Sequence, residues 1–159
     1  MSEKPKFVYV IYIASTPEKV FDALTDTAMS ERYWSGGRLE TDWKVGAPFR
    51  LKLKHQTSDA TGKVLEVDRP RRLAYTFIGH GDFAAEGETR VAFDIEAHKD
   101  QVKLTVTHDG FAAGSKLFEG ISGGWPHVLS SLKSFLETGQ GLRAPWYEER
   151  QPERQGAAS

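Results

Sequence analysis

The stretch GISGGWPHVLSSLKSFLETG, residues 120–139, decides the fold of this chain. At helical spacing its large apolar side chains fall on one wide stripe, and serine, lysine and glutamate occupy the opposite face. The stripe consists of Ile121, Trp125, Val128, Leu129, Leu132, Phe135 and Leu136. A long amphipathic helix of this kind buries its stripe against another element, and the rest of the chain indicates which one.

Most of the preceding sequence reads as short strands. Apolar and polar residues alternate with a period of two, most clearly where Phe49, Leu51 and Leu53 are separated by basic residues. The predicted strands span residues 7–13, 38–43, 49–54, 63–67, 73–78, 89–96 and 102–108. Short turn-like connections between them predict an antiparallel sheet.

Two short helices are expected between the first strand and the others. Ser15 or Thr16 can cap a helix over residues 17–24, and Pro17 suits its first position because no backbone N–H is needed there. A second helix is predicted over residues 27–33. The order of one strand, two helices, about six strands and one long helix predicts the α+β class.

The proline at position 126 complicates the long helix. Inside a helix, proline removes a backbone hydrogen bond and clashes with the preceding turn. The helix is therefore expected either to be kinked near Trp125 or to begin afresh there, with Pro126 in its first turn.

Composition sets limits on the class of protein. The 159 residues fit one domain, and 21 basic against 22 acidic residues argue against a nucleic-acid binder. There is no cysteine, so disulfides and thiolate chemistry are excluded. The apolar run near the N-terminus is too short for a membrane span or a signal peptide, so no membrane partner and a cytoplasmic location are expected.

The domain is expected to cover residues 1–139. Residues 140–159 contain two prolines and many charges, which is typical of a flexible or loosely docked tail. Trp146 and Tyr147 are the reason to expect that part of this tail docks on the body of the protein.

A series of short segments, in a fixed order, carries a family resemblance. They are ASTPEKVFDALT (14–25) after the first strand, Trp34, Gly46 near Phe49, GKVLEV (62–67) before Pro70 and Leu73, LTVTHDGF (104–111), and Gly124-Trp125 before LSSLKSFLE (129–137). With this series the chain resembles the START-like (SRPBCC) superfamily. Within it, the chain is similar to the bacterial single-domain relatives of the C-terminal domain of the activator of the heat-shock chaperone ATPase.

The resemblance implies a helix-grip fold, in which a curved antiparallel sheet of six to seven strands wraps a long C-terminal helix. It also implies a cavity, since START-like domains mostly bind apolar small molecules between the sheet and this helix. Some members of the superfamily are cyclases or hydrolases, whereas this branch is largely without assigned activity. The chaperone-activating relatives make a chaperone an alternative partner.

The candidate ligand-binding residues are those expected on the inner face of the sheet and on the buried stripe of the helix. From the residues alone, a filled core is the simpler interpretation, and the resemblance favours a pocket. His108 shares the parity of Leu104 and Val106 and is expected to point inward, while the pattern leaves the side of Glu66 open. The predicted set is Trp34, Phe49, Tyr75, Phe77, Phe93, His108, Trp125 and Leu129.

No catalytic residue or cofactor is predicted. The sequence has no nucleophile elbow and no phosphate-binding glycine loop, and its five histidines lack metal-ligand spacing. Three hypotheses remain: a domain that binds an apolar or aromatic, lipid-like small molecule, a protein-interaction module, and an enzyme that uses His108. A homodimer through an uncovered sheet edge or helix is also open. The mouth of the pocket is expected at Gly123-Gly124-Trp125-Pro126.

Overall fold

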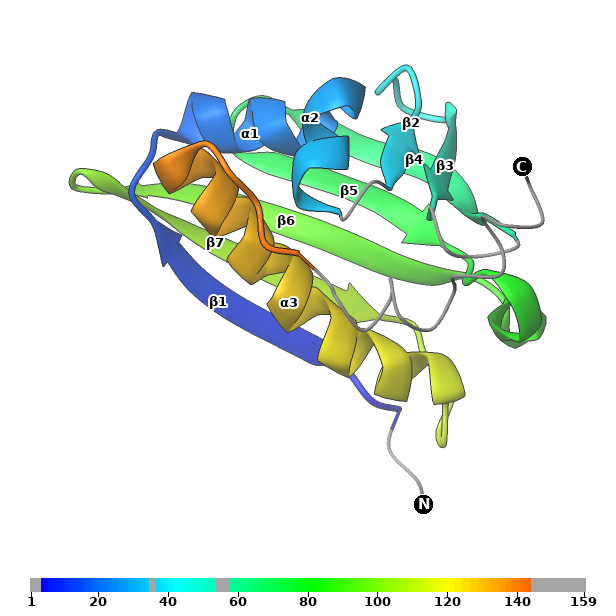
Figure 1. Ribbon diagram of the computed structural model, residues 1–159. Coiled ribbons are helices and arrows are strands. Elements are labelled where there is room, and N and C mark those ends of the chain that lie inside the picture. Colours follow the sequence, from blue (N-terminus) through cyan, green and yellow to red (C-terminus); the bar gives the residue numbers. More distant parts are fainter. Residues whose placement is uncertain (1–3, 35–36, 54–57, 144–159) are drawn as a thin grey trace, which may run out of the picture.

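The computed structural model describes residues 4–34, 37–53 and 58–143 (Figure 1). These residues form a single curved sheet with one long helix across its concave face. The elements in chain order are β1 (Phe7–Ile13), α1 (Pro17–Thr25), α2 (Thr27–Tyr33), β2 (Arg38–Glu40), β3 (Pro48–Lys52), β4 (Ala60–Asp68), β5 (Arg72–Phe77), the 3₁₀ helix η1 (Gly81–Glu86), β6 (Thr89–His98), β7 (Gln101–Asp109) and α3 (Lys116–Thr138).

The sheet has seven strands in the order β1-β7-β6-β5-β4-β3-β2, and every neighbouring pair is antiparallel. The first strand therefore pairs with the last and forms one edge of the sheet, beside α3. The α+β helix-grip fold expected from the sequence is confirmed. Within the described ranges, no helix combines the length and apolar character needed to cross a membrane.

The two short helices form where the sequence predicts them. The side chain of Thr16 accepts the backbone N–H of Lys19 at 3.3 Å, and Pro17 occupies the first turn of α1. Asp26 separates the helices and accepts the N–H of Met29 at 2.9 Å at the start of α2. The buried side of α1 consists of Val20, Phe21, Ala23 and Leu24.

The long helix α3 is continuous across Pro126 and begins at Lys116, so the prediction of a fresh start near Trp125 is wrong. Ser115 caps it by accepting the N–H of Phe118 at 3.0 Å. Glu86 of η1 accepts the N–H groups of Lys116 and Leu117, each at 3.1 Å. These bonds satisfy donors at the first turn, where the buried Leu117 extends the apolar stripe toward the N-terminus of the helix.

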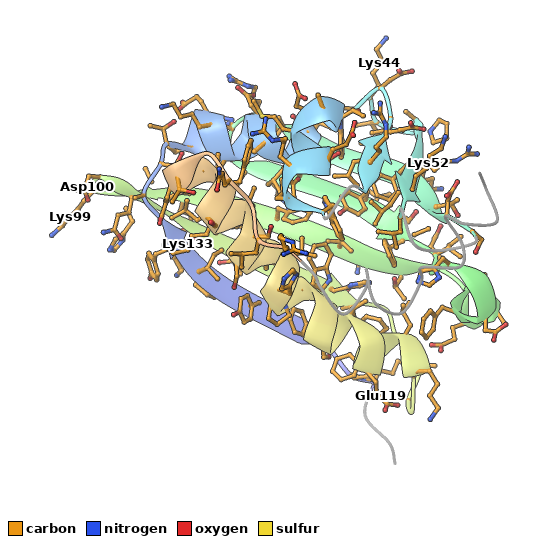
Figure 2. All side chains as sticks on the ribbon, in the orientation of Figure 1. Lys44, Lys52, Lys99, Asp100, Glu119 and Lys133 are labelled. Atoms are coloured by element: carbon orange, nitrogen blue, oxygen red, sulfur yellow. The ribbon has the colours of Figure 1, made fainter. Side chains whose placement is uncertain are left out.

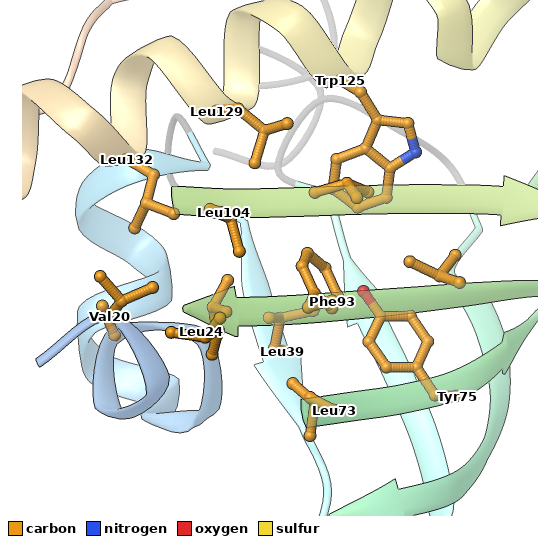
Figure 3. Close-up of a cluster of buried hydrophobic side chains, with 14 of the residues drawn as sticks. Val20, Leu24, Leu39, Leu73, Tyr75, Phe93, Leu104, Trp125, Leu129 and Leu132 are labelled. Carbon is orange, nitrogen blue, oxygen red and sulfur yellow. The ribbon is translucent and has the colours of Figure 1, made fainter. Parts of the chain in front are cut away.

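The core lies between the concave face of the sheet and the helices (Figure 3). Alternate strand residues face inward, as the period of two predicts. Trp125, Leu129 and Leu132 of α3 point down onto Phe93 and Leu104 of the sheet. The half-buried Phe135 and Leu136 pack at the margin of this core.

Three details depart from the strand predictions. The strand expected over residues 38–43 ends at Glu40, and Trp43 adopts a positive φ of 54° outside the sheet. The register of β4 shifts between Val64 and Glu66, where a β-bulge interrupts the alternation. The bulge turns Glu66 to the outer face opposite Ala74, which settles the side that the sequence pattern left open.

Candidate functional site

The predicted aromatic residues meet in one connected cluster beneath α3. Phe49 of β3 stacks on Tyr75 of β5 with ring centroids 4.2 Å apart. Tyr75 contacts Phe93 at 5.9 Å, Phe93 contacts Trp125 at 5.8 Å, and Trp125 contacts Trp34 at 5.7 Å. The cluster therefore runs from β3 across the sheet to α3 and to the C-terminal end of α2.

His108 holds Trp125 in place through a fully buried chain of hydrogen bonds. The indole Nε1–H of Trp125 donates to Nδ1 of His108 at 3.1 Å. The neutral imidazole consequently carries its proton on Nε2, which lies 2.8 Å from Oγ1 of Thr89 and donates to it. The Thr89 hydroxyl in turn donates to the carbonyl of Phe77 at 2.7 Å.

This arrangement favours a positioning role for His108 over proton transfer. Burial lowers its pKa to about 3, and both ring nitrogens are engaged within the protein. Phe77 and Phe111 enclose the imidazole, with ring centroids 5.4 Å and 4.5 Å away. A general base needs a free nitrogen near its substrate, so His108 in this state does not offer one.

The space left between the sheet and α3 is small. A cavity of about 10 Å³ lies there, close to the volume that one water molecule needs. Its lining joins α1, α2, β2, β5, β6 and α3, and consists of Leu24, Tyr33, Trp34, Leu39, Tyr75, Phe93, Trp125, Val128, Leu129 and Leu132. The cavity extends from Trp125 toward the C-terminal half of α3. Gly123 and Gly124, predicted as part of a mouth, do not line it.

Trp34 is a polar member of this lining whose indole N–H has no hydrogen bond to a described residue. Among the described residues, its Nε1 is the one buried side-chain nitrogen or oxygen that has no partner. The neighbouring Tyr33 is fully buried and donates its hydroxyl to the carbonyl of Ala23 at 3.0 Å. Burial raises the pKa of Tyr33, and the adjacent Trp34 side chain offsets part of this rise without reaching hydrogen-bond geometry.

The eight predicted ligand-binding residues divide into two groups. Trp34, Tyr75, Phe93, Trp125 and Leu129 line the cavity. Phe49, Phe77 and His108 lie behind them and support them. Five further lining residues were not predicted as ligand contacts, although helical spacing already placed two of them, Val128 and Leu132, on the buried stripe. The five are Leu24, Tyr33, Leu39, Val128 and Leu132.

A larger hollow lies on the opposite, convex face of the sheet. It has a volume of about 340 Å³ and a floor that includes Ala74, Ala92 and Thr107. Its walls carry ion pairs: Arg72 binds Glu66 at 2.9 Å and Asp94 at 2.6 Å, and Arg90 binds Asp109 at 3.4 Å. These exposed pairs satisfy one another, so the hollow has the character of a solvated surface.

The described residues contain no group of three or more histidine, aspartate or glutamate side chains able to hold a metal ion.

Of the predicted tail, residues 140–159, the structure describes only the first four residues, 140–143. Residues 140–143 fold back along α3, where Ser131 Oγ accepts the N–H of Leu142 at 2.8 Å. Trp146 and Tyr147 lie outside the described residues.

Comparison with known proteins agrees with this geometry. A family model described as "Activator of Hsp90 ATPase homolog 1-like protein" matches residues 14–137. No curated protein matches the chain. Among solved structures, an Aha1 dimer from Colwellia psychrerythraea has a TM-score of 0.74 at 22% identity, over 86% of this chain and 99% of that one.

Two further structures share the fold. A protein from Mesorhizobium loti has a TM-score of 0.75 at 22% identity, over 84% of this chain and 97% of that one. An Hsp90 activator from Plasmodium falciparum has a TM-score of 0.61 at 22% identity, over 76% of this chain and 86% of that one. At such identities these structures establish a common fold and leave the activity to be argued from the site.

Proposed function

The chain belongs to the family of Activator of Hsp90 ATPase homolog 1-like proteins, and we propose that it binds an apolar or aromatic small molecule between the sheet and α3. One observation carries this proposal. The cavity there is lined by aromatic rings, among them that of Trp34, whose buried indole N–H no described residue satisfies. An apolar lining with an available polar group is typical of a small-molecule site.

A ligand needs more room than this cavity offers. An engineered cavity of roughly 150 Å³ accommodates benzene, and the space between the sheet and α3 is about 10 Å³. Binding therefore requires a lining side chain to move. The energetic cost of this movement decides which side chain that is.

Trp34 is the side chain that moves at the lowest cost. It lies at the C-cap of α2, is half-buried and makes no side-chain hydrogen bond among the described residues. Displacing it breaks its edge-to-face contact with Trp125, which is worth about 0.5–1.5 kcal/mol beyond the area that it buries.

Trp125 forms the fixed wall opposite. It is 5% exposed, and the hydrogen bond to His108 connects it to Thr89 on β6. Moving Trp125 would break a buried hydrogen bond and leave the imidazole without its donor, which costs more than the loss of a ring contact. The site that we propose is thus a fixed wall facing a movable indole.

Thermal unfolding with indole and naphthalene as probes tests this function. A ligand that binds only the folded protein raises the unfolding temperature. We expect Trp34→Ala to enlarge the cavity and to show a greater probe-induced rise than the wild-type chain. The matched control is Trp43→Ala, because Trp43 lies outside the cavity lining and donates its indole N–H to Thr25 at 2.6 Å.

The proposal fails if neither probe stabilises Trp34→Ala more than it stabilises Trp43→Ala. Both variants must first show a cooperative unfolding transition in the absence of probe. Trp34→Phe serves in place of the alanine variant if the latter does not fold, since it removes the N–H and part of the ring.

The family name gives one further candidate, the binding of a cytoplasmic chaperone ATPase of the Hsp90 class. This hypothesis predicts an exposed interaction patch, independent of the cavity. The discriminating measurement is the ATPase rate of the purified chaperone with excess domain, using wild type and Trp34→Ala. A rate raised equally by both supports the interaction module, and an unchanged rate removes it.

A further inference from the structure

The two edges of the sheet are built differently. At one edge, β2 has only three residues and carries two charged side chains. Arg38 binds Glu31 and Glu40, and Lys52 binds Glu40 at 3.6 Å. A short, charged strand discourages pairing with another chain.

At the other edge, β1 has seven residues, FVYVIYI, with no charge, glycine or proline. Strand β7 pairs with one side of β1, and no described strand pairs with the other. On the convex face of the sheet, Val8, Val10 and Tyr12 are 53%, 44% and 42% exposed. A long apolar edge of this kind is a template for strand addition.

Helix α3 protects only one end of this edge. Nζ of Lys133 donates to the carbonyl of Tyr12 at 2.8 Å, where α3 passes beside β1 (Figure 2). Glu137 accepts the N–H of Ala14, also at 2.8 Å. Because backbone groups alternate in direction along a strand, those of Val8 and Val10 face the same open side as the Tyr12 carbonyl.

We propose that this open edge binds a second copy of the chain, with the two β1 strands antiparallel about a two-fold axis at Val10. This register pairs Phe7 with Ile13 of the partner subunit, Val8 with the partner's Tyr12, and Val10 with the partner's Val10. All seven residues of β1 are then paired, and residues of one face meet residues of the same face.

The register is self-complementary in shape and bonding. Val8, Val10 and Tyr12 of both copies form one continuous apolar row on the convex face. The Tyr12 carbonyl has two lone pairs, so it can accept the N–H of the partner's Val8 and keep its bond to Lys133. The two sheets join without disturbing α3.

Self-complementarity favours a second copy over another partner. The uncharged run of β1 pairs with itself about Val10, and no charged side chain of β1 enters the strand pair. In this register the exposed Lys6 lies opposite Ala14 of the partner subunit. Glu137, which accepts the Ala14 N–H, is already paired with Lys133 at 2.6 Å, so the charges of α3 at this end are balanced within each copy. The two-fold axis repeats this arrangement at the other end of the strand pair.

Disulfide trapping tests the register directly, because the chain has no cysteine of its own. In the proposed pair the two Val10 Cα atoms lie about 5.5 Å apart, within disulfide range. Under mild oxidation we expect Val10→Cys to form a covalent dimer at least ten times faster than Val8→Cys. In this register the two Val8 positions lie about 13 Å apart along the strands. Equal rates, or faster trapping of Val8→Cys, would overturn the proposal.

Sedimentation equilibrium tests the association without a cross-link. The wild-type chain is expected to shift toward twice its monomer mass as concentration rises. Val10→Lys places two like charges at the axis and should remain monomeric. The control Val45→Lys, at an exposed position between β2 and β3, should associate as the wild type does. The proposal is wrong if the wild type stays monomeric, or if Val10→Lys associates equally well.

Discussion

His108 illustrates what the sequence predicts at the scale of one residue. Its parity with Leu104 and Val106 correctly indicated an inward side chain, and the residue is fully buried. Its hydrogen-bond partners, Trp125 and Thr89, lie 17 and 19 positions away on other elements. A local pattern carries no information about such distant partners, so the choice between a structural and a catalytic histidine needed the fold.

The buried imidazole makes stability depend on pH in a defined direction. Its pKa is about 3 in the folded chain and about 6.5 in the unfolded chain. Between these values the unfolded state binds the additional proton, so stability falls as the pH falls through this window. The free energy of unfolding is expected to drop by up to about 1.4 kcal/mol per pH unit.

Urea unfolding of wild type and His108→Gln between pH 6 and 5 measures this contribution. Glutamine can accept from Trp125 and donate to Thr89 but does not titrate, so the variant should show a shallower pH dependence. Burial also lowers the pKa of His80, which contributes equally in both proteins. An unchanged slope in His108→Gln would mean that the imidazole accepts a proton in the folded state.

At the scale of the elements, periodic patterns predicted well and non-local contacts did not. The two short helices and the strands of the sheet were predicted because each carries a helical or alternating pattern. The start of α3 was missed although the buried Leu117 continues the apolar stripe, because the bonds that begin the helix come from Ser115 and from Glu86, 30 positions before Lys116. The positive φ of Trp43 was missed because an aromatic residue in a strand-like run gives no local sign of a turn.

The glycines of α3 and β4 are expected to respond in opposite ways to alanine. Gly124 lies in the helix interior, and a Cβ there would meet no atom within 4 Å. Gly124→Ala should therefore raise stability by about 0.5–1 kcal/mol through helix propensity. At Gly62 a Cβ would lie 2.0 Å from the carbonyl oxygen of Thr76, so Gly62→Ala should lower stability by about 1–3 kcal/mol.

Chemical denaturation of the wild type, Gly124→Ala and Gly62→Ala checks this pair of predictions. Equal m-values in the three proteins would show that the midpoints report stability alone. A destabilising Gly124→Ala would show that the glycine pair before Pro126 serves the geometry of the helix. A neutral Gly62→Ala would show that β4 can move away from β5 at little cost.

For the whole molecule, the sequence predicted the architecture and left the interior volume open. The alternating pattern of the strands and the apolar stripe of α3 were enough to predict a sheet packed against a long helix. Whether the interior holds a ligand-sized space depends on how side chains such as Leu24, Leu39 and Leu132 fill it from three separate elements. Their contributions combine only in the folded structure, and they leave a cavity of about 10 Å³. The proposed binding consequently depends on motion of Trp34.

The concave and convex faces of the sheet should act independently in the whole molecule. Val10 lies at the outer edge, whereas Trp34 lies against α3 on the other side of the sheet. Val10→Lys is therefore expected to abolish association and to leave the thermal response to indole and naphthalene unchanged. Trp34→Ala should increase that response and associate as the wild type does. Mutations at distant sites without shared partners usually add, so the double variant should combine both effects. Loss of both properties in either single variant would indicate that the edge and the cavity are coupled through β1 and α3.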